Sequence, residues 1–218
     1  MRFSQETKIA HVRLRVKDLK KSVTFYSDLL GFRAVMREDS AVALSATGQL
    51  PFQILLSESP AAQPRPPRTT GQFHIAIRSP NREELAKTLL RLAEHGYRIH
   101  GAADHAVSEA IYLADPDGKG IELYCDRPKE EWKRVNGELY MTTDYLDVEA
   151  LLKEAEAKSW AGIHPPTDIG HIHLNVGSLE TAEAFYHHHT GVNIWAGRNA
   201  TRPPEDAAGL ETWTRTHF

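Results

Sequence analysis

The strongest constraint in this sequence is an internal repeat. Residues 9–32, IAHVRLRVKDLKKSVTFYSDLLGF, align with residues 169–192, IGHIHLNVGSLETAEAFYHHHTGV. Eight of the 24 aligned positions are identical: Ile9/Ile169, His11/His171, Leu14/Leu174, Val16/Val176, Leu19/Leu179, Phe25/Phe185, Tyr26/Tyr186 and Gly31/Gly191. Alternating apolar residues at the start of each copy predict a half-buried strand, and the apolar stripe that follows predicts a helix. The chain is therefore built from repeated strand-then-helix units.

A third, more diverged copy lies between these two. Its strand is predicted over Phe73 to Ile77, and its helix runs from an N-cap at Asn81 to Gly96. Three further apolar segments follow each of the first two helices, so each unit reads as one strand, one helix and three strands. A unit of this size cannot bury its apolar face alone, and units must pair. We expect an α+β fold of paired βαβββ modules.

The units suggest a domain organisation. Residues 1–127 are predicted to form a paired metal-binding domain from modules 9–58 and 72–127, joined by the Pro-rich linker 59–71. Residues 128–168 read as a helical connector, because apolar residues from Val148 to Ala155 recur at helical spacing. The last part, 169–218, lacks three clear strands after its helix and is expected to be a truncated third and fourth module. Such a module would expose strand edges, and it would fray or pair with a second copy of the chain, giving a homo-oligomer.

Composition excludes several classes of protein. The formal charge is -3 at pH 7, with both signs mixed along the chain, so a nucleic-acid partner is not expected. No apolar run is long enough to span a membrane, and the first residues lack the apolar core of a signal peptide, so we expect a cytoplasmic protein. The single cysteine, Cys125, excludes an internal disulfide and is interpreted as a packing residue.

A carboxylate stands in an unusual place. In DPDGKGIELYCD, residues 115–126, Glu122 lies inside a short apolar strand, on the face opposite to Ile121 and Leu123. The unit alignment places His11 and His74 at equivalent points on their first strands. If the first two modules pair about a pseudo-twofold axis, two imidazoles and one carboxylate converge. This donor set is that of non-haem Fe(II) oxygenases, and a bound cation compensates the buried carboxylate.

These residues carry a resemblance to a known family. The segments HVRLRVKDLKKSVTFYSDLLGF, FHIAIRS and DPDGKGIELYCDRP resemble the vicinal oxygen chelate superfamily, which includes glyoxalases and bleomycin resistance proteins. Within it, the His, His, Glu set resembles the extradiol catechol 2,3-dioxygenases, enzymes of aromatic catabolism with tandem βαβββ modules. The resemblance implies a mononuclear Fe(II), with Mn(II) as the alternative ion, held by His11, His74 and Glu122. It also implies a catechol-type substrate, dioxygen as co-substrate, and catalytic roles for Tyr112 and His105.

Other readings stay open at this point. A glyoxalase-like isomerase or thiol transferase would use Gln53, in the first unit's last strand, as a further metal ligand and would consume no oxygen. A sequestering module would bind an aromatic molecule without turnover. His171 matches His11 and His173 shares its face, which leaves a second metal site open. The run His187 to His189 is not expected to bind one ion, because adjacent helical residues point in different directions.

Overall fold

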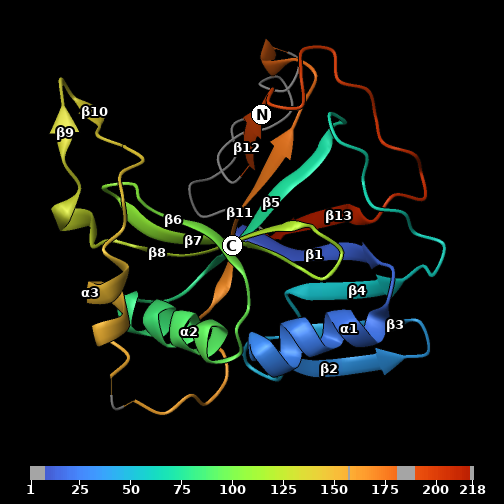
Figure 1. The fold of residues 1–218 in the computed structure, drawn as a ribbon, viewed down its shortest axis with the longest axis horizontal. Helices are drawn as coiled ribbons and strands as arrows, with labels where there is room; N and C mark the ends of the chain where they lie inside the picture. Colours follow the sequence, from blue (N-terminus) through green and yellow to red (C-terminus); the bar gives the residue numbers. More distant parts are fainter. Residues whose placement is uncertain (1–7, 157, 181–189, 217–218) are drawn as a thin grey trace.

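The computed structural model describes residues 8–156, 158–180 and 190–216. The described elements, in chain order, are β1 (Lys8–Val16), α1 (Leu19–Val23), η1 (Thr24–Leu29), β2 (Arg33–Glu38), β3 (Ala41–Ser45), β4 (Ile54–Glu58), β5 (Gly71–Arg78), α2 (Arg82–Glu94), β6 (Ile99–Asp104), β7 (Ser108–Ala114), β8 (Gly120–Asp126), η2 (Lys129–Glu131), β9 (Arg134–Val135), β10 (Glu138–Leu139), α3 (Val148–Lys153), β11 (Asp168–Asn175), β12 (Thr190–Asn193) and β13 (Gly209–Thr216). Figure 1 shows their arrangement. The predicted α+β class is confirmed.

Two copies of the same strand-helix-strand-strand-strand unit form the two ends of one large sheet. The sheet order is β2-β3-β4-β1-β11-β5-β8-β7-β6, so each unit contributes four neighbouring strands. In both units the first and last strands pair in parallel, β1 with β4 and β5 with β8, whereas the other pairs within each unit are antiparallel. The repeat in the sequence is therefore a repeat in the fold.

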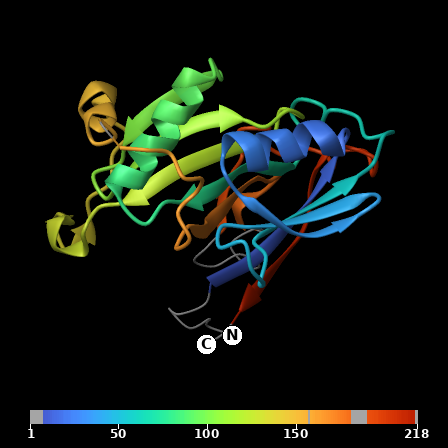
Figure 2. The ribbon, with the colours of Figure 1, turned by 90° about the horizontal axis from the view of Figure 1, so that it is seen from below.

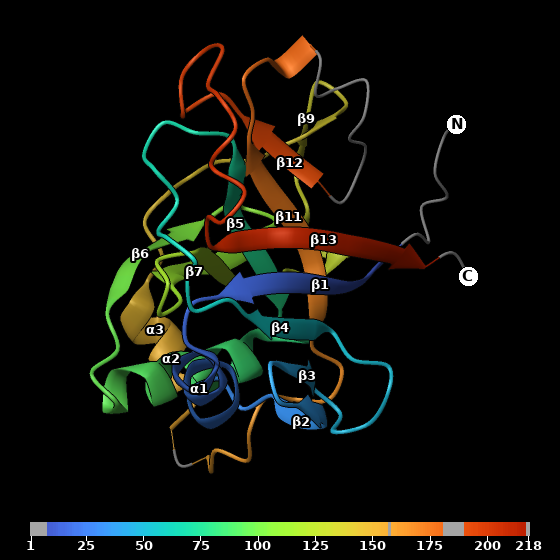
Figure 3. The ribbon, with the colours of Figure 1, turned by 90° about the vertical axis from the view of Figure 1, so that its right-hand side faces the viewer.

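The two units do not pair directly. Strand β11, from the third copy of the repeat, lies between β1 and β5, and β13 pairs with β1 (Figure 3). The contact of β11 with β5 extends from Asp168 to Asn175, whereas its contact with β1 is a single pair, Ile9 with Ile169. The C-terminal strands were expected to expose their edges. Strand β11 is an interior strand, whereas β12 and β13 each pair with one of the described strands, β11 and β1 respectively.

Local sequence signals place the helices. Asp18 caps α1 by accepting from the Lys21 amide at 2.9 Å. Asn81 caps α2, as predicted, by accepting from the Glu84 amide at 2.9 Å. Gly31 follows η1 with φ of +86°, and a Cβ there would collide with the backbone of Gly162 and Ile163 in the connector. Figure 2 shows α1 and α2 on the same side of the sheet.

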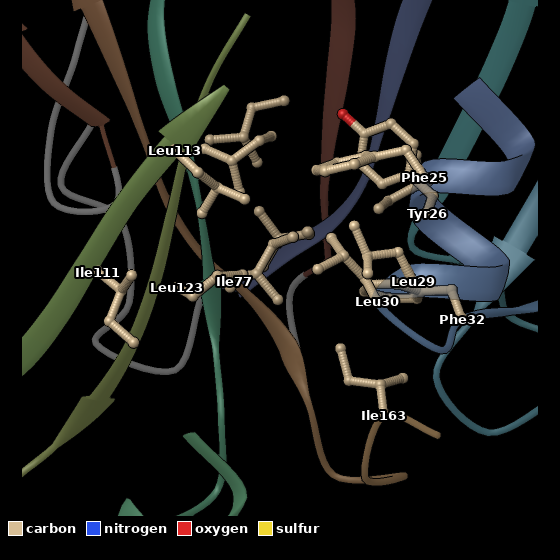
Figure 4. Packing of buried hydrophobic residues seen from close by; sticks show 14 of the residues in the cluster. Phe25, Tyr26, Leu29, Leu30, Phe32, Ile77, Ile111, Leu113, Leu123 and Ile163 are labelled. Carbon is tan, nitrogen blue, oxygen red and sulfur yellow. The ribbon is translucent and has the colours of Figure 1, made fainter. Parts of the chain in front are cut away.

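The core lies between these helices and the covered face of the sheet. Phe25, Tyr26, Leu29 and Leu30 of η1 and its C-cap meet Ile77, Leu113 and Leu123 of the second unit in one cluster (Figure 4). A polar contact joins the units as well, because the Tyr26 hydroxyl donates to Asp115 at 3.2 Å, in the loop that leads into β8. The opposite face of the second unit's sheet is not covered by these helices.

Candidate metal centre

Four strands of the second half present one row of side chains on the uncovered face. The register pairs Tyr112 on β7 with Glu122 on β8, Glu122 with Ala76 on β5, and Ala76 with His171 on β11. The neighbouring row on β5 and β11 pairs His74 with His173. Because residues paired across a sheet point to the same face, these side chains meet above the small methyl group of Ala76.

An irregularity in β11 turns His171 toward this face. The register shifts between Ile169, which pairs with Ile77, and His171, which pairs with Ala76, so Gly170 is an extra residue. Ile169 consequently points into the core, where it is 2% exposed, whereas His171 points to the opposite face. A Cβ at residue 170 would overlap the hydroxyl of Tyr124. Glycine is therefore required at the position that aims the imidazole.

Three side chains converge on one point. The Nε2 atoms of His74 and His171 lie 2.9 and 3.1 Å from Oε2 of Glu122, and 3.2 Å from each other. One ligand atom from each of the three residues falls within 4.8 Å of the others. Among the described residues this is the one group of at least three potential ligands that close together.

Glu122 is an anion despite its burial. The residue is 4% exposed. Burial raises the pKa of its carboxyl, but the hydrogen bonds from His171 and His74 lower it by more, and the pKa lies well below the ordinary value. A buried carboxylate between two imidazoles is a suitable set of ligands for a divalent cation. A side chain that only fills an apolar core would not carry a charge.

The contact between the two imidazoles also fits a cation. If both Nε2 atoms carried a proton and donated to Glu122, the two N–H groups would face each other at 3.2 Å, which is repulsive. A divalent cation at their common point would be bound by the nitrogen lone pairs instead. The residues therefore fit a metal, and two histidines with one carboxylate leave coordination positions open for other ligands.

A second chain of hydrogen bonds leads away from Glu122. The Tyr112 hydroxyl lies 3.3 Å from Oε1 of Glu122 and 2.8 Å from Nε2 of His105. The Nδ1 atom of His105 faces the carbonyl oxygen of Thr142 at 2.7 Å, so it carries a proton and donates. Burial, followed by the charge of Glu122, raises the pKa of Tyr112 well above its ordinary value. The phenol therefore keeps its proton, and its hydroxyl lies within hydrogen-bond distance of both His105 and Glu122.

A cavity of about 650 Å³ opens on this face. It is lined by Phe73, His74, His100, His105, Ser108, Tyr112, Leu113, Gly120, Ile121, Glu122, Tyr124, Met141, Thr143, His171, His173 and Trp195. His173 contributes a neutral imidazole at neutral pH, because burial and then the neighbouring His74 and His171 lower its pKa to about 4. The cavity has the size of sites that enclose small organic ligands.

Comparison with known proteins agrees with this fold. The family model described as "Glyoxalase/Bleomycin resistance protein/Dioxygenase superfamily" matches residues 8–123. A catechol-2,3-dioxygenase of Bacillus subtilis (strain 168) is 41% identical over 96% of this chain and 82% of its own length. The chain belongs to the glyoxalase/bleomycin resistance protein/dioxygenase superfamily.

Two further matches are more distant. A biphenyl-2,3-diol 1,2-dioxygenase of Rhodococcus globerulus is 30% identical over 64% of this chain and 75% of its own length. The crystal structure of the cppA protein from Streptococcus pneumoniae TIGR4 covers 97% of this chain and 83% of its own, with a TM-score of 0.59 and 16% sequence identity. That structural likeness concerns the fold alone.

Of the three predicted metal ligands, His74 and Glu122 lie together in the structure, whereas His11 does not join them. The ring of His11 packs on Phe52 with centroids 4.8 Å apart, and its Nε2 lies 3.3 Å from the Thr214 hydroxyl. The reason is topological. Because β11 separates β1 from β5, the imidazole that reaches Glu122 comes from the third copy of the repeat and not from the first. Predicted residues Tyr112 and His105 lie beside the group, as described above.

His171 is the ligand candidate that the sequence reasoning did not select. The signal was present, because the repeat aligns His171 with His11. Gln53, the further ligand of the glyoxalase-like alternative, is not in the group: its Oε1 accepts from the Ala46 amide at 2.9 Å. The run His187 to His189 lies outside the described residues. In the part of the chain that the structure describes, no helix is sufficiently long and apolar to cross a membrane.

Proposed function

We propose that this protein is an extradiol ring-cleaving dioxygenase that acts on catechols and uses Fe(II) held by His74, Glu122 and His171. The observation that carries the proposal is the convergence of two imidazole nitrogens on one buried carboxylate oxygen, at 2.9 and 3.1 Å. The 41% identity to a catechol-2,3-dioxygenase over nearly the whole chain supports the reaction class. The same donor set would also accept Mn(II).

Bound Fe(II) would supply the means to hold a catechol through both oxygens, to lower the pKa of its hydroxyls and to bring dioxygen to the ring. Glu122 would remain an anion throughout, because a bound divalent cation stabilises the ionised form of a carboxyl. Its negative charge and the two neutral imidazoles would leave a net positive charge on the site, which favours an ionised catechol.

The proton released by the substrate needs an acceptor. In the proposed reaction Tyr112 and His105 perform this role: the hydroxyl of Tyr112 donates to Nε2 of His105, which therefore has a lone pair available for one proton. Thr142 fixes this tautomer by accepting from Nδ1. When His105 is protonated, the Tyr112 hydroxyl can turn its hydrogen toward Glu122, 3.3 Å away, and present its oxygen to a donor. The pair would accept a proton and return it later.

The decisive experiment is a ring-cleavage assay. The protein is loaded with Fe(II) without air, catechol is added, and oxygen consumption is followed together with formation of the yellow muconic semialdehyde. We expect stoichiometric oxygen uptake with colour, and we expect His74→Ala to abolish both iron retention and colour. Catechol binding without oxygen uptake by iron-loaded protein would refute the dioxygenase and favour the sequestering module. Turnover of a thiol or hemithioacetal substrate without oxygen would favour the glyoxalase-like alternative.

A further inference from the structure

The mouth of the cavity carries two large apolar side chains that are left in contact with solvent. Trp195 is 71% exposed and Met141 is 62% exposed, and both line the same cavity as the candidate metal ligands. Trp195 follows β12, whereas Met141 belongs to the connector after β10. An apolar side chain that lines a cavity and is also exposed loses its contact with water when a ligand fills that cavity.

The side chain and backbone of Trp195 are held by contacts with neighbouring residues of the cavity wall. Its ring meets Phe73 edge to face, with centroids 5.0 Å apart and an interplanar angle of 81°. Its amide donates to the side-chain oxygen of Asn193 at 2.9 Å, and the side-chain nitrogen of Asn193 lies 3.1 Å from Nε2 of His173. The ring of His173 in turn lies 4.8 Å from that of His74. The indole is thus fixed in position relative to the candidate metal ligands.

Met141 is held by its neighbour. Thr142 accepts from Nδ1 of His105 at 2.7 Å and donates its amide to the carbonyl of His105 at 3.3 Å. These two contacts attach the connector to the loop that carries the proposed proton acceptor. The backbone next to Met141 is therefore held beside this loop, and the flexible apolar side chain of Met141 lines the cavity, where it can adapt to ligands of different shape.

The charged residues of the cavity lining disfavour a substrate with an anionic substituent. Among the described lining residues, Glu122 is the one carboxylate, and there is no lysine or arginine. The exposed members are His100, Met141, Thr143 and Trp195. An anionic group on the substrate would find no permanent positive charge at the mouth, whereas an uncharged apolar group would cover Trp195 and Met141.

We propose that Trp195 and Met141 form an outer subsite for an uncharged, apolar substituent on the catechol ring, so that the preferred substrates are alkyl- or aryl-substituted catechols and not catechol carboxylates. This inference rests on the proposed ring-cleaving function and deepens it. Trp195 acts here as a specificity-determining residue, because it would touch the substituent and not the reacting oxygens. The cavity, at about 650 Å³, is larger than a single unsubstituted ring requires.

The test compares the iron-loaded protein with its Trp195→Ala and Met141→Ala variants on catechol, the two propylcatechol isomers and a dihydroxybenzoate. We expect at least one propylcatechol to have the highest kcat/KM and the dihydroxybenzoate the lowest. Trp195→Ala should lower kcat/KM for the preferred propylcatechol about tenfold or more, mainly through KM, and by a larger factor than it lowers kcat/KM for catechol. Leu50→Ala is the matched control, because Leu50 is 70% exposed and is not a lining residue. Equal losses on catechol and propylcatechol, or preference for the dihydroxybenzoate, would overturn the subsite.

A binding measurement separates failure of the subsite from failure of the proposed function. Propylcatechol is titrated into the iron-loaded protein without oxygen, and tryptophan fluorescence is compared between the unaltered chain and Trp195→Phe. Quenching that depends on Trp195 and is tighter for propylcatechol than for catechol supports the subsite, even if no ring is cleaved. Ring cleavage together with equal affinities for the two compounds would refute the subsite and leave the dioxygenase standing.

Discussion

The two halves of the sheet have the same topology, but only one of them carries the candidate metal centre. The repeat aligns His11 with His74, and two residues further along the strands Arg13 aligns with Ala76. Crossing the second half, the row through this position reads Tyr112, Glu122, Ala76 and His171. Crossing the first half, the equivalent row reads Ala43, Leu55, Arg13 and Thr212. Leu55 thus stands at the position equivalent to Glu122. Thr212 of β13 stands at the position equivalent to His171 of β11.

The difference shows that backbone topology alone does not make the site. In the second half the methyl group of Ala76 leaves room above the sheet for three ligands. In the first half Arg13 occupies that room, and both Arg13 and Arg15 form ion pairs with Glu211 at 2.8 Å. The same strands can therefore support a cation-binding group or a surface network of ion pairs, depending on which side chains face outward.

The largest expected difference is between two variants in which one of the aligned histidines, His171 or His11, is replaced by alanine. His171→Ala should weaken iron binding by more than about 100-fold, since even groups outside the direct ligands of a metal typically contribute 10–100-fold. His11→Ala should leave iron content and ring cleavage unchanged. Iron per chain after desalting, measured by metal analysis, checks both variants. If His11→Ala loses iron and His171→Ala retains it, His11 and not His171 is the metal ligand.

Tyr112→Phe should give the next largest effect. Removal of the hydroxyl breaks the contacts with His105 and Glu122. We expect kcat to fall about 100-fold, which is typical for the loss of general acid-base catalysis. Iron content should not change, because Tyr112 is outside the ligand group. Steady-state kinetics and metal analysis on the same preparation test this expectation. Unaltered kcat would remove Tyr112 from the reaction.

Gly170→Ala tests the bulge that aims His171. A methyl group there would overlap the Tyr124 hydroxyl, so we expect the unfolding free energy to fall by about 1–3 kcal/mol and iron to bind more weakly. In the first copy the aligned residue is Ala10, and Ala10→Gly should cost at most about 1 kcal/mol and spare iron binding. Denaturant unfolding and iron titration compare the two changes. Because the register of β1 also shifts between Ile9 and His11, equal behaviour of the two variants would show that glycine has no special role at position 170.

The smallest effect is expected in the first half. Glu211→Gln removes the ion pairs with Arg13 and Arg15, whose side chains are 49% and 29% exposed. Because exposed ion pairs contribute little, we expect a loss of about 0–1 kcal/mol and a fall in Tm of at most about 2–4 °C. Thermal unfolding measures it. Loss of ring cleavage in this variant would mean that the two halves are more tightly coupled than the geometry indicates.

The sequence predicted the repeated unit, its helix caps and two of the three clustered ligands, because all of these depend on local pattern or on alignment within one unit. It did not predict His171, because the choice between His11 and His171 depends on which strand lies beside β5. That choice is made by long-range packing: Ile169, Ile172 and Leu174 bury against the core of both units. Alternation of apolar residues looks the same in β1 and β11, and so it could not distinguish them.

The position of β11 has a consequence for how the protein becomes active during its synthesis. Glu122 and His74 emerge from the ribosome well before His171, and a nascent chain that ends at residue 127 would contain the whole of both units but only two ligands. N-terminal segments generally fold first during synthesis. The edge of β5 would therefore stay without its neighbour β11 until the third copy of the repeat has been synthesised. Iron capture would then report that the last third of the chain has reached its place.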